Sequence, residues 1–179
     1  MTWVVLATGP SMSQALADSV SGRGLVVAVS DAYRLAPWAD AVVSTDAAWW
    51  GEHPGAKELP GRKFTAAPTH QKIEGVERLA VASSTNSGLL GIMAAVHMGA
   101  KRVMLCGFDM RAPGQHFFGL HPKPLKTTTA ERMEVFKRQF RAYRPAGVEI
   151  INCTPGSHLL AYPFGDLEDC LAQSAVLDT

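Results

Sequence analysis

The sequence lacks an excess of charge of either sign, and this absence removes two classes of partner. Its 17 lysines and arginines nearly balance its 16 aspartates and glutamates, so the formal net charge is +1. Such a balance produces no overall field that would attract nucleic acid or an anionic membrane surface. We therefore expect a small-molecule ligand and no nucleic-acid partner.

Long apolar runs and targeting signals are also missing. No apolar run approaches the ~20 residues that a membrane-spanning helix needs. The chain passes from Met1 almost directly into a strand-like run, without the basic and apolar regions of a secretory signal. These features predict a cytoplasmic protein with no membrane span.

Cysteine is scarce, and its spacing excludes two kinds of structural support. The three cysteines, Cys106, Cys153 and Cys170, are widely separated and form no C-x-x-C pair. Neither a disulfide framework nor a zinc site is therefore indicated. We expect Cys106 and Cys153 to pack as small buried hydrophobes.

The sequence does contain an alternation of apolar strands and amphipathic helices. A Ser11 and Gln14 pair and a Thr128 and Glu131 pair match helix capping boxes, and a third helix is expected from Asn86 to Met98 before Gly99. Strands are expected at Trp3–Ala7, Leu25–Val29, Val42–Val43, Leu79–Ala82, Val103–Cys106 and Val148–Ile151.

This alternation predicts a fold class. It indicates a single α/β domain over residues 1–179, Rossmann-like and doubly wound, with a mostly parallel sheet and helices on both faces. No repeat or linker divides the chain. The stretch from Gly51 to Thr69 is rich in proline, glycine and lysine, and we expect it to be a surface excursion with one strand-like piece, Phe64–Ala67. Trp49 and Trp50 either stack on a ligand ring or, as we favour, fill the core.

Polar residues follow the expected strands at the edge where open α/β sheets bind ligands. Gly9-Pro10-Ser11 follows the first strand, Ser30-Asp31 the second and Ser44-Thr45-Asp46 the third. The first group reads either as a phosphate-binding turn or as an ordinary strand-to-helix turn. It matches neither a dinucleotide fingerprint nor a P-loop. Asp31 and Asp46 have no metal-ligand spacing.

The stretch from Ser83 to His121 contains the strongest signal. Its helix opens with Ser84-Thr85-Asn86-Ser87-Gly88, which could hold a phosphate or simply cap the helix. Its strand ends in Gly107-Phe108-Asp109, and Asp109 could orient a ribose hydroxyl, hold a metal ion or cap the next loop. His116 and His121 follow in that loop. Either could take a proton near neutral pH, or be a locally bonded loop histidine.

Four blocks, in the same order, resemble the Cst-type bacterial sialyltransferases. These blocks are Gly9-Pro10-Ser11, the stretch from Thr85-Asn86-Ser87-Gly88 to Gly107-Phe108-Asp109, the histidine segment from His116 to His121, and Cys153-Thr154-Pro155-Gly156-Ser157. The Gly-Pro-Ser start and the Gly-x-Asp strand end are also similar to those of the related MptE-like proteins, which include archaeal 6-hydroxymethylpterin diphosphokinases.

The resemblance implies a nucleotide-binding transferase, most simply a glycosyltransferase that uses a CMP-activated sugar. His116 would match the general base that deprotonates the acceptor hydroxyl, with His121 beside it as a second candidate. No tightly bound cofactor is implied. The positions that would contact the nucleotide or the sugar are Gly9, Pro10, Ser11, Ser30, Asp31, Thr45, Asp46, Thr85, Asn86, Ser87, Gly88, Gly107, Phe108 and Asp109.

Two departures from that family leave other functions open. Thr8 stands where an asparagine precedes Gly-Pro-Ser, and only Met110 to Gln115 separates Asp109 from His116, where the family carries a long lid with tyrosines. The second reading is an MptE-like diphosphokinase, in which ATP and Mg²⁺ would occupy the same edge and the carboxylates of Asp31, Asp46 or Asp109 would hold the metal. The third reading is a non-catalytic nucleotide-binding protein, of the short, lidless kind that a phage genome could encode.

The C-terminal segment leaves the oligomeric state open. It carries an apolar group, Tyr162, Phe164 and Leu167. These side chains cover either the core of their own chain or a neighbouring subunit in a homo-oligomer.

Overall fold

The computed structural model describes residues 1–82, 84–120, 125 and 128–177. Within them the chain forms one seven-stranded sheet in which every neighbouring pair is parallel. The strands, in the spatial order β5-β4-β3-β2-β1-β6-β7, are β5 (Glu77–Arg78), β4 (Arg62–Thr65), β3 (Ala41–Val43), β2 (Leu25–Val29), β1 (Thr2–Leu6), β6 (Arg102–Cys106) and β7 (Glu149–Asn152).

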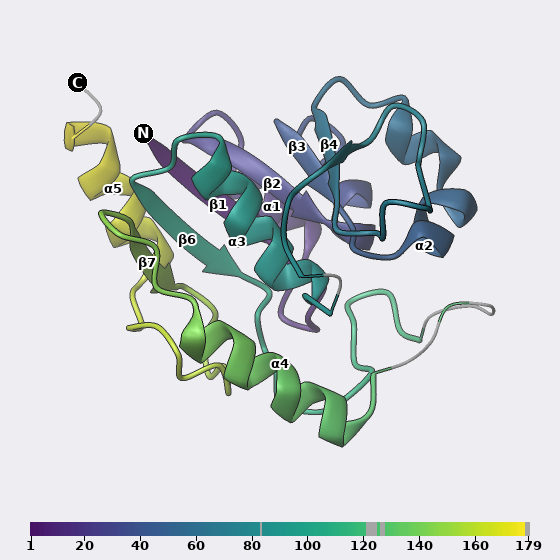
Figure 1. The fold of residues 1–179 in the computed structure, drawn as a ribbon. Helices are drawn as coiled ribbons and strands as arrows, with labels where there is room; N and C mark the ends of the chain where they lie inside the picture. The colour runs from purple at the N-terminus through teal and green to yellow at the C-terminus, as the bar shows by residue number, and fades with distance from the viewer. Residues whose placement is uncertain (83, 121–124, 126–127, 178–179) are drawn as a thin grey trace.

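Helices cover both faces of this sheet (Figure 1). On one face, α3 (Ser87–His97) and α4 (Ala130–Ala142) pack on alternate residues of the strands, among them Val5 and Leu105. On the other face, α1 (Gln14–Val20), α2 (Ala47–Glu52) and α5 (Leu167–Leu177) pack on the intervening residues, such as Val4 and Met104. The predicted Rossmann-like, doubly wound fold is confirmed. The fully apolar strands explain it, because a parallel sheet covered on both sides needs both faces of each strand apolar.

Two helix caps lie beside the predicted positions. The first helix is capped by Ser13, whose hydroxyl accepts from the Leu16 N–H at 3.2 Å, and not by Ser11. The fourth is capped by Thr129, which accepts from the Arg132 N–H at 3.3 Å, and not by Thr128. The capping-box pattern therefore identified both helix starts but not the capping residue. At the first turn, the Ser11 hydroxyl is instead bonded to Asp109.

The strand-like piece predicted at Phe64–Ala67 is present two residues earlier, as β4, but the stretch around it was predicted to be a surface excursion and β4 is an internal strand, so that part of the prediction is wrong. Strand β4 lies between β3 and β5, and its Phe64 is fully buried. A short 3-10 helix, η2 (Pro54–Lys57), precedes β4. A second one, η1 (Ser30–Arg34), follows β2. The strand predicted at Leu79–Ala82 is also displaced. The pairing residues are Glu77 and Arg78, because the pairing partner of Phe64 is Glu77.

The tryptophans and cysteines pack in the core. Trp49 and Trp50 are buried, as favoured from the sequence, and their rings meet edge to face with centroids 5.0 Å apart. Cys106, Cys153 and Cys170 are buried and free, which confirms the predicted packing of the first two. Burial raises the pKa of Cys153 to about 12, and the thiol of Cys170 beside it acts in the same direction.

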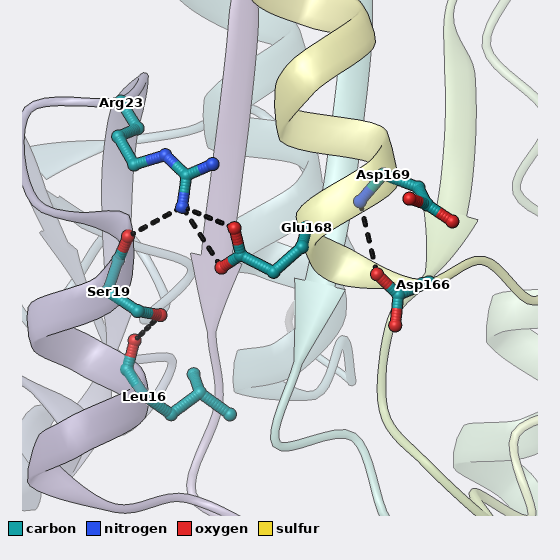
Figure 2. Close-up of polar contacts among 6 residues, drawn as sticks. All are labelled: Leu16, Ser19, Arg23, Asp166, Glu168 and Asp169. Atoms are coloured by element: carbon teal, nitrogen blue, oxygen red, sulfur yellow. Dashed lines mark hydrogen bonds and ion pairs between the residues drawn. The ribbon is translucent and has the colours of Figure 1, made fainter.

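The C-terminal segment packs on its own chain. Tyr162 is buried, and its hydroxyl donates to the Phe140 carbonyl oxygen at 3.0 Å, whereas Phe164 is 53% exposed. Helix α5 buries Cys170 and Leu171 against the sheet. Figure 2 shows Arg23, just after α1, directed at the Glu168 carboxylate on α5, at 2.8 and 3.0 Å. No described helix is long and apolar enough to cross a bilayer.

Candidate functional site

A cavity of about 630 Å³ opens at the carboxyl ends of the strands. It lies where the strand order reverses: the chain leaves β1 for β2 on one side, and returns to β6 on the other side of β1 (Figure 1). Doubly wound proteins bind ligands at such a switch point. Of the residues predicted for the site, the lining includes Gly9, Pro10, Ser30, Thr45, Asp46, Thr85, Asn86, Ser87, Gly88, Gly107, Phe108, Asp109 and His116.

The turn after β1 is bonded directly to the end of β6. The Gly9 N–H donates to the Gly107 carbonyl oxygen at 2.9 Å, and the Ser11 hydroxyl donates to the Asp109 carboxylate at 2.7 Å. A Cβ atom on Gly9 would collide with that carboxylate and with the Gly107 carbonyl oxygen. Glycine is therefore required at this position by packing alone, whether or not a ligand also approaches it.

Two strand ends at the cavity carry unusual backbone angles. Ser30, directly after β2, has φ 47°, and Met110, directly after Asp109, has φ 50°. Both line the cavity. Non-glycine residues rarely adopt positive φ, and such conformations cluster at binding sites because the surrounding structure must hold them.

The end of β3 is linked to the start of α3. The Thr45 N–H donates to the Ser87 hydroxyl at 3.1 Å, and the two side-chain hydroxyls lie 2.9 Å apart. Asn86 caps the helix by accepting from the Leu89 N–H at 2.9 Å, and its amide donates to Gln139 of α4 at 3.1 Å. The capping function of Asn86 is thus observed. Ser87 and Gly88, whose N–H groups have no carbonyl partner within the helix, line the cavity.

Two predicted site residues lie outside the cavity lining, and a third is not described. Asp31 is buried outside the lining, where its carboxylate accepts from the Trp49 indole N–H at 2.9 Å and lies 3.3 Å from Nε2 of His53. Ser11 is also outside the lining, bonded to Asp109. His121 lies outside the described residues. Asp46 lines the cavity but also caps α2 through the Ala48 N–H at 2.9 Å.

His116 is held against the first turn. Its Nδ1 lies 3.0 Å from the Thr8 hydroxyl, and the Phe117 N–H donates to the Thr8 carbonyl oxygen at 3.0 Å. The imidazole stacks on Phe118 with centroids 4.9 Å apart, and its Nε2 is buried. The loop after β6 is therefore bonded back onto the residue that precedes Gly9.

One wall of the cavity is apolar, and of its residues only Phe108 was predicted from the sequence. Phe108 lies edge to face with Phe140, and both line the cavity with Met133 and Phe136 of α4. The apolar face of α4 had the periodicity of a core helix, and only its position beside the switch point makes it a cavity wall. The sequence signal that could have identified this wall is the position of α4, which follows directly after the loop that carries His116.

Described residues of the segment between β6 and α4 form part of the cavity lining. Met110, Arg111, Ala112, Gly114 and Gln115 contribute to the lining, and so do Leu125 and Thr128 further along the chain. The lining residues include two cations, Arg111 and Arg132, and two carboxylates, Asp46 and Asp109. Within the described residues, no three His, Cys, Asp or Glu side chains come together as metal ligands.

Comparisons with protein-family models, with curated proteins and with solved structures found no match to this chain. The site is therefore interpreted from its own geometry.

Proposed function

We propose that this protein is a nucleotide-binding transferase, most simply a glycosyltransferase that takes a CMP-activated sugar. One observation carries the proposal. The cavity at the switch point joins a polar end, made of strand ends and the first turn of α3, to an apolar wall from α4. A nucleotide has two matching parts, an anionic phosphate and a planar base whose ring faces can stack on an apolar surface.

The polar end suits a phosphate. The first turn of α3 presents N–H groups and the positive end of the helix dipole, both of which favour an anion. Ser87 and Gly88 in that turn line the cavity, and so do Gly9 and Pro10 of the turn after β1. The hydrogen bonds from Thr45 to Ser87 hold the turn in place before a ligand arrives, so little ordering would oppose binding.

The apolar wall suits a base or a sugar ring. Phe108, Met133 and Phe136 offer contact surface to a planar ring. A cavity of about 630 Å³ lies within the range of small-molecule sites, roughly 300–1,000 Å³.

His116 is the residue we assign as the general base. Its Nδ1 already contacts a hydroxyl, that of Thr8, at 3.0 Å. During transfer, an acceptor hydroxyl would take this place and give its proton to Nδ1. The acceptor oxygen then bonds to the anomeric carbon, and the bond from that carbon to the phosphate oxygen breaks. CMP leaves with the electron pair.

The nucleotide is identified by thermal shift. We expect the melting temperature to rise with CMP or CDP more than with ATP or GTP, because a ligand stabilises the state that it binds. Each nucleotide is tested with and without Mg²⁺. A shift that needs ATP together with Mg²⁺ would support the diphosphokinase reading instead, and no shift with any nucleotide would reject a nucleotide site.

Turnover then tests the reaction. We expect the wild type to release CMP from a CMP-sugar, and His116→Ala to lose at least about a hundredfold in rate, a typical contribution of a general base. His70→Ala is the control, because His70 is exposed and absent from the cavity lining. Transfer that survives His116→Ala undiminished would show that His116 is not the base. Nucleotide binding without turnover would support the non-catalytic reading.

A further inference from the structure

Arg111 is attached to the backbone of the loop after β7 and not to an acidic side chain. Its Nε–H donates to the Gly156 carbonyl oxygen at 2.8 Å, and its Nη2 donates to the Pro155 carbonyl oxygen at 3.0 Å. Among the described residues it has no carboxylate partner within ion-pair distance. Its positive charge is therefore not neutralised there.

The two bonds use only one side of the guanidinium. An arginine carries five N–H donors in a planar fork, and Nε with the nearer Nη2 hydrogen forms one edge. The Nη1 group and the second Nη2 hydrogen remain, and they make the adjacent, end-on edge of the fork. This remaining edge is the geometry that holds two oxygens of one phosphate. Arg111 is exposed and lines the cavity.

The loop that holds Arg111 is itself rigidly bonded to the end of β6. The Ser157 hydroxyl donates to the Phe108 carbonyl oxygen at 2.5 Å, and the Phe108 N–H donates to the Thr154 hydroxyl at 3.0 Å. Gly156 has φ 61°, and a Cβ atom there would collide with Nη2 of Arg111. The backbone at Gly156 is thus shaped so that the guanidinium can lie against it.

We propose that Arg111 is a pre-positioned phosphate-binding residue, which receives a phosphate of the ligand through the free edge of its guanidinium. The inference rests on the proposed nucleotide site and adds a specific anion contact to it. Because the side chain is already held by two backbone carbonyls, binding would order it little further. A lysine at this position cannot make the same contact, since an ammonium has no second edge.

The experiment is a calorimetric titration with three probes: CMP, cytidine and inorganic pyrophosphate. We expect Arg111→Ala and Arg111→Lys to weaken CMP and pyrophosphate binding about tenfold or more, as for loss of a charge-assisted bidentate contact. Cytidine binding should change less than about twofold, because cytidine lacks the phosphate. Gly156→Ala keeps the charge but displaces the guanidinium, so it should weaken the same two probes.

The matched control is Arg144→Lys. Arg144 is also exposed and bonded to backbone carbonyl oxygens, those of Phe140, Tyr143 and Ala161, but it does not line the cavity. We expect it to bind all three probes like the wild type. Melting curves of every variant identify any that fail to fold. If Arg111→Ala fails to fold, Arg111→Lys provides the test.

The outcomes separate the two proposals. Nucleotide binding that is unchanged in both Arg111 variants overturns the role of Arg111 and leaves the proposed function standing. If the wild type binds pyrophosphate but neither CMP nor cytidine, and the Arg111 variants lose that binding, the nucleotide site is rejected and the anion contact of Arg111 is supported. Equal weakening of cytidine and CMP would show that Arg111 only supports the loop, and a wild type that binds no probe overturns both proposals.

Discussion

Several side chains predicted for the candidate site form hydrogen bonds with one another. The Ser11 hydroxyl is bonded to Asp109, and the Ser87 hydroxyl is bonded to Thr45. Asp31 follows β2, where a dinucleotide-binding protein would place a ribose-binding carboxylate, yet it is committed to Trp49 and His53. The position of each residue after a strand predicted a ligand contact. The hydrogen bonds with neighbouring side chains determine what each residue does in the folded protein.

Gly9 is the residue whose substitution tests this packing most directly. We expect Gly9→Ala to lower the free energy of unfolding by about 1–3 kcal/mol, because the added methyl group collides with the Asp109 carboxylate and the Gly107 carbonyl oxygen. Urea denaturation measures the change. Gly51→Ala is the control: Gly51 lies in α2 with open space around it, so alanine should be neutral or stabilising. Equal stability of the two variants would contradict the packing requirement.

At the scale of elements, the start of α3 joins three parts of the fold. Asn86 caps the helix and bonds to Gln139 of α4, while Ser87 bonds to Thr45 at the end of β3. Gln139 in turn donates to the Ser84 carbonyl oxygen at 2.9 Å. The position of the first helical turn, which we propose receives the phosphate, is therefore set by contacts with both α4 and the sheet.

Asn86→Ala should destabilise the protein by about 0.5–2 kcal/mol, the usual cost of losing a helix cap. Asn86→Asp keeps the acceptor for the Leu89 N–H but loses the donor to Gln139. This variant separates the helix cap from the bond to Gln139, and we expect a loss of stability between those of the wild type and Asn86→Ala. Chemical denaturation measures both variants, with Ser13→Ala as a comparison cap at an exposed position. An Asn86→Ala variant as stable as the wild type would show that the cap is dispensable.

At the scale of the whole molecule, two apolar layers enclose the sheet, and the C-terminal segment closes one end of it. Tyr162 joins that segment to α4 through the Phe140 carbonyl oxygen, and Arg144 lies over its ring at 5.0 Å. On the other face, Arg23 and Glu168 connect α1 to α5 at the surface (Figure 2). This ion pair is exposed, so we assign it only a small share of the stability.

The buried tyrosine predicts how stability depends on pH. Burial raises the pKa of Tyr162 to about 12, and the nearby Arg144 only partly opposes the rise. The unfolded tyrosine ionises near pH 10, about 2 units lower. Its contribution to stability is therefore complete below about pH 10, and it is lost as the pH rises toward 12, because only the unfolded chain releases the proton.

Tyr162→Phe should reduce this alkaline loss of stability. At neutral pH the variant should lose only about 0.5–1.5 kcal/mol, since the Phe140 carbonyl oxygen keeps its bond from Arg144. Urea denaturation between pH 8 and pH 11 compares the two proteins. Burial also raises the pKa values of Cys106 and Cys153, so these thiols add to the alkaline loss of stability in the wild type and in the variant alike. Parallel pH profiles for the wild type and the variant would contradict the assignment to Tyr162.

Much of the fold was predictable because local patterns agree with the tertiary structure. The strand at Leu25–Val29 has the predicted bounds, and α3 lies within the predicted range. Two strands lie two residues before their predicted positions: β4 at Arg62–Thr65 in place of Phe64–Ala67, and β5 at Glu77–Arg78 in place of Leu79–Ala82. Both are short and partly polar, and their bounds are set by pairing with β3 and with each other, which no local pattern reveals.

The sequence by itself determined the doubly wound architecture and the edge of the sheet at which polar residues gather. Apolar runs of strand length alternate with helical periodicity, and both signals are local. Only the tertiary structure decided which polar residues reach the cavity, because Asp31 and Ser11 lie next to lining residues along the chain and yet bond elsewhere. It also brought the apolar face of α4 and the guanidinium of Arg111, held by a loop 44 residues further along the chain, to the same cavity. Such contacts join residues distant in sequence, so they depend on how the strands are ordered.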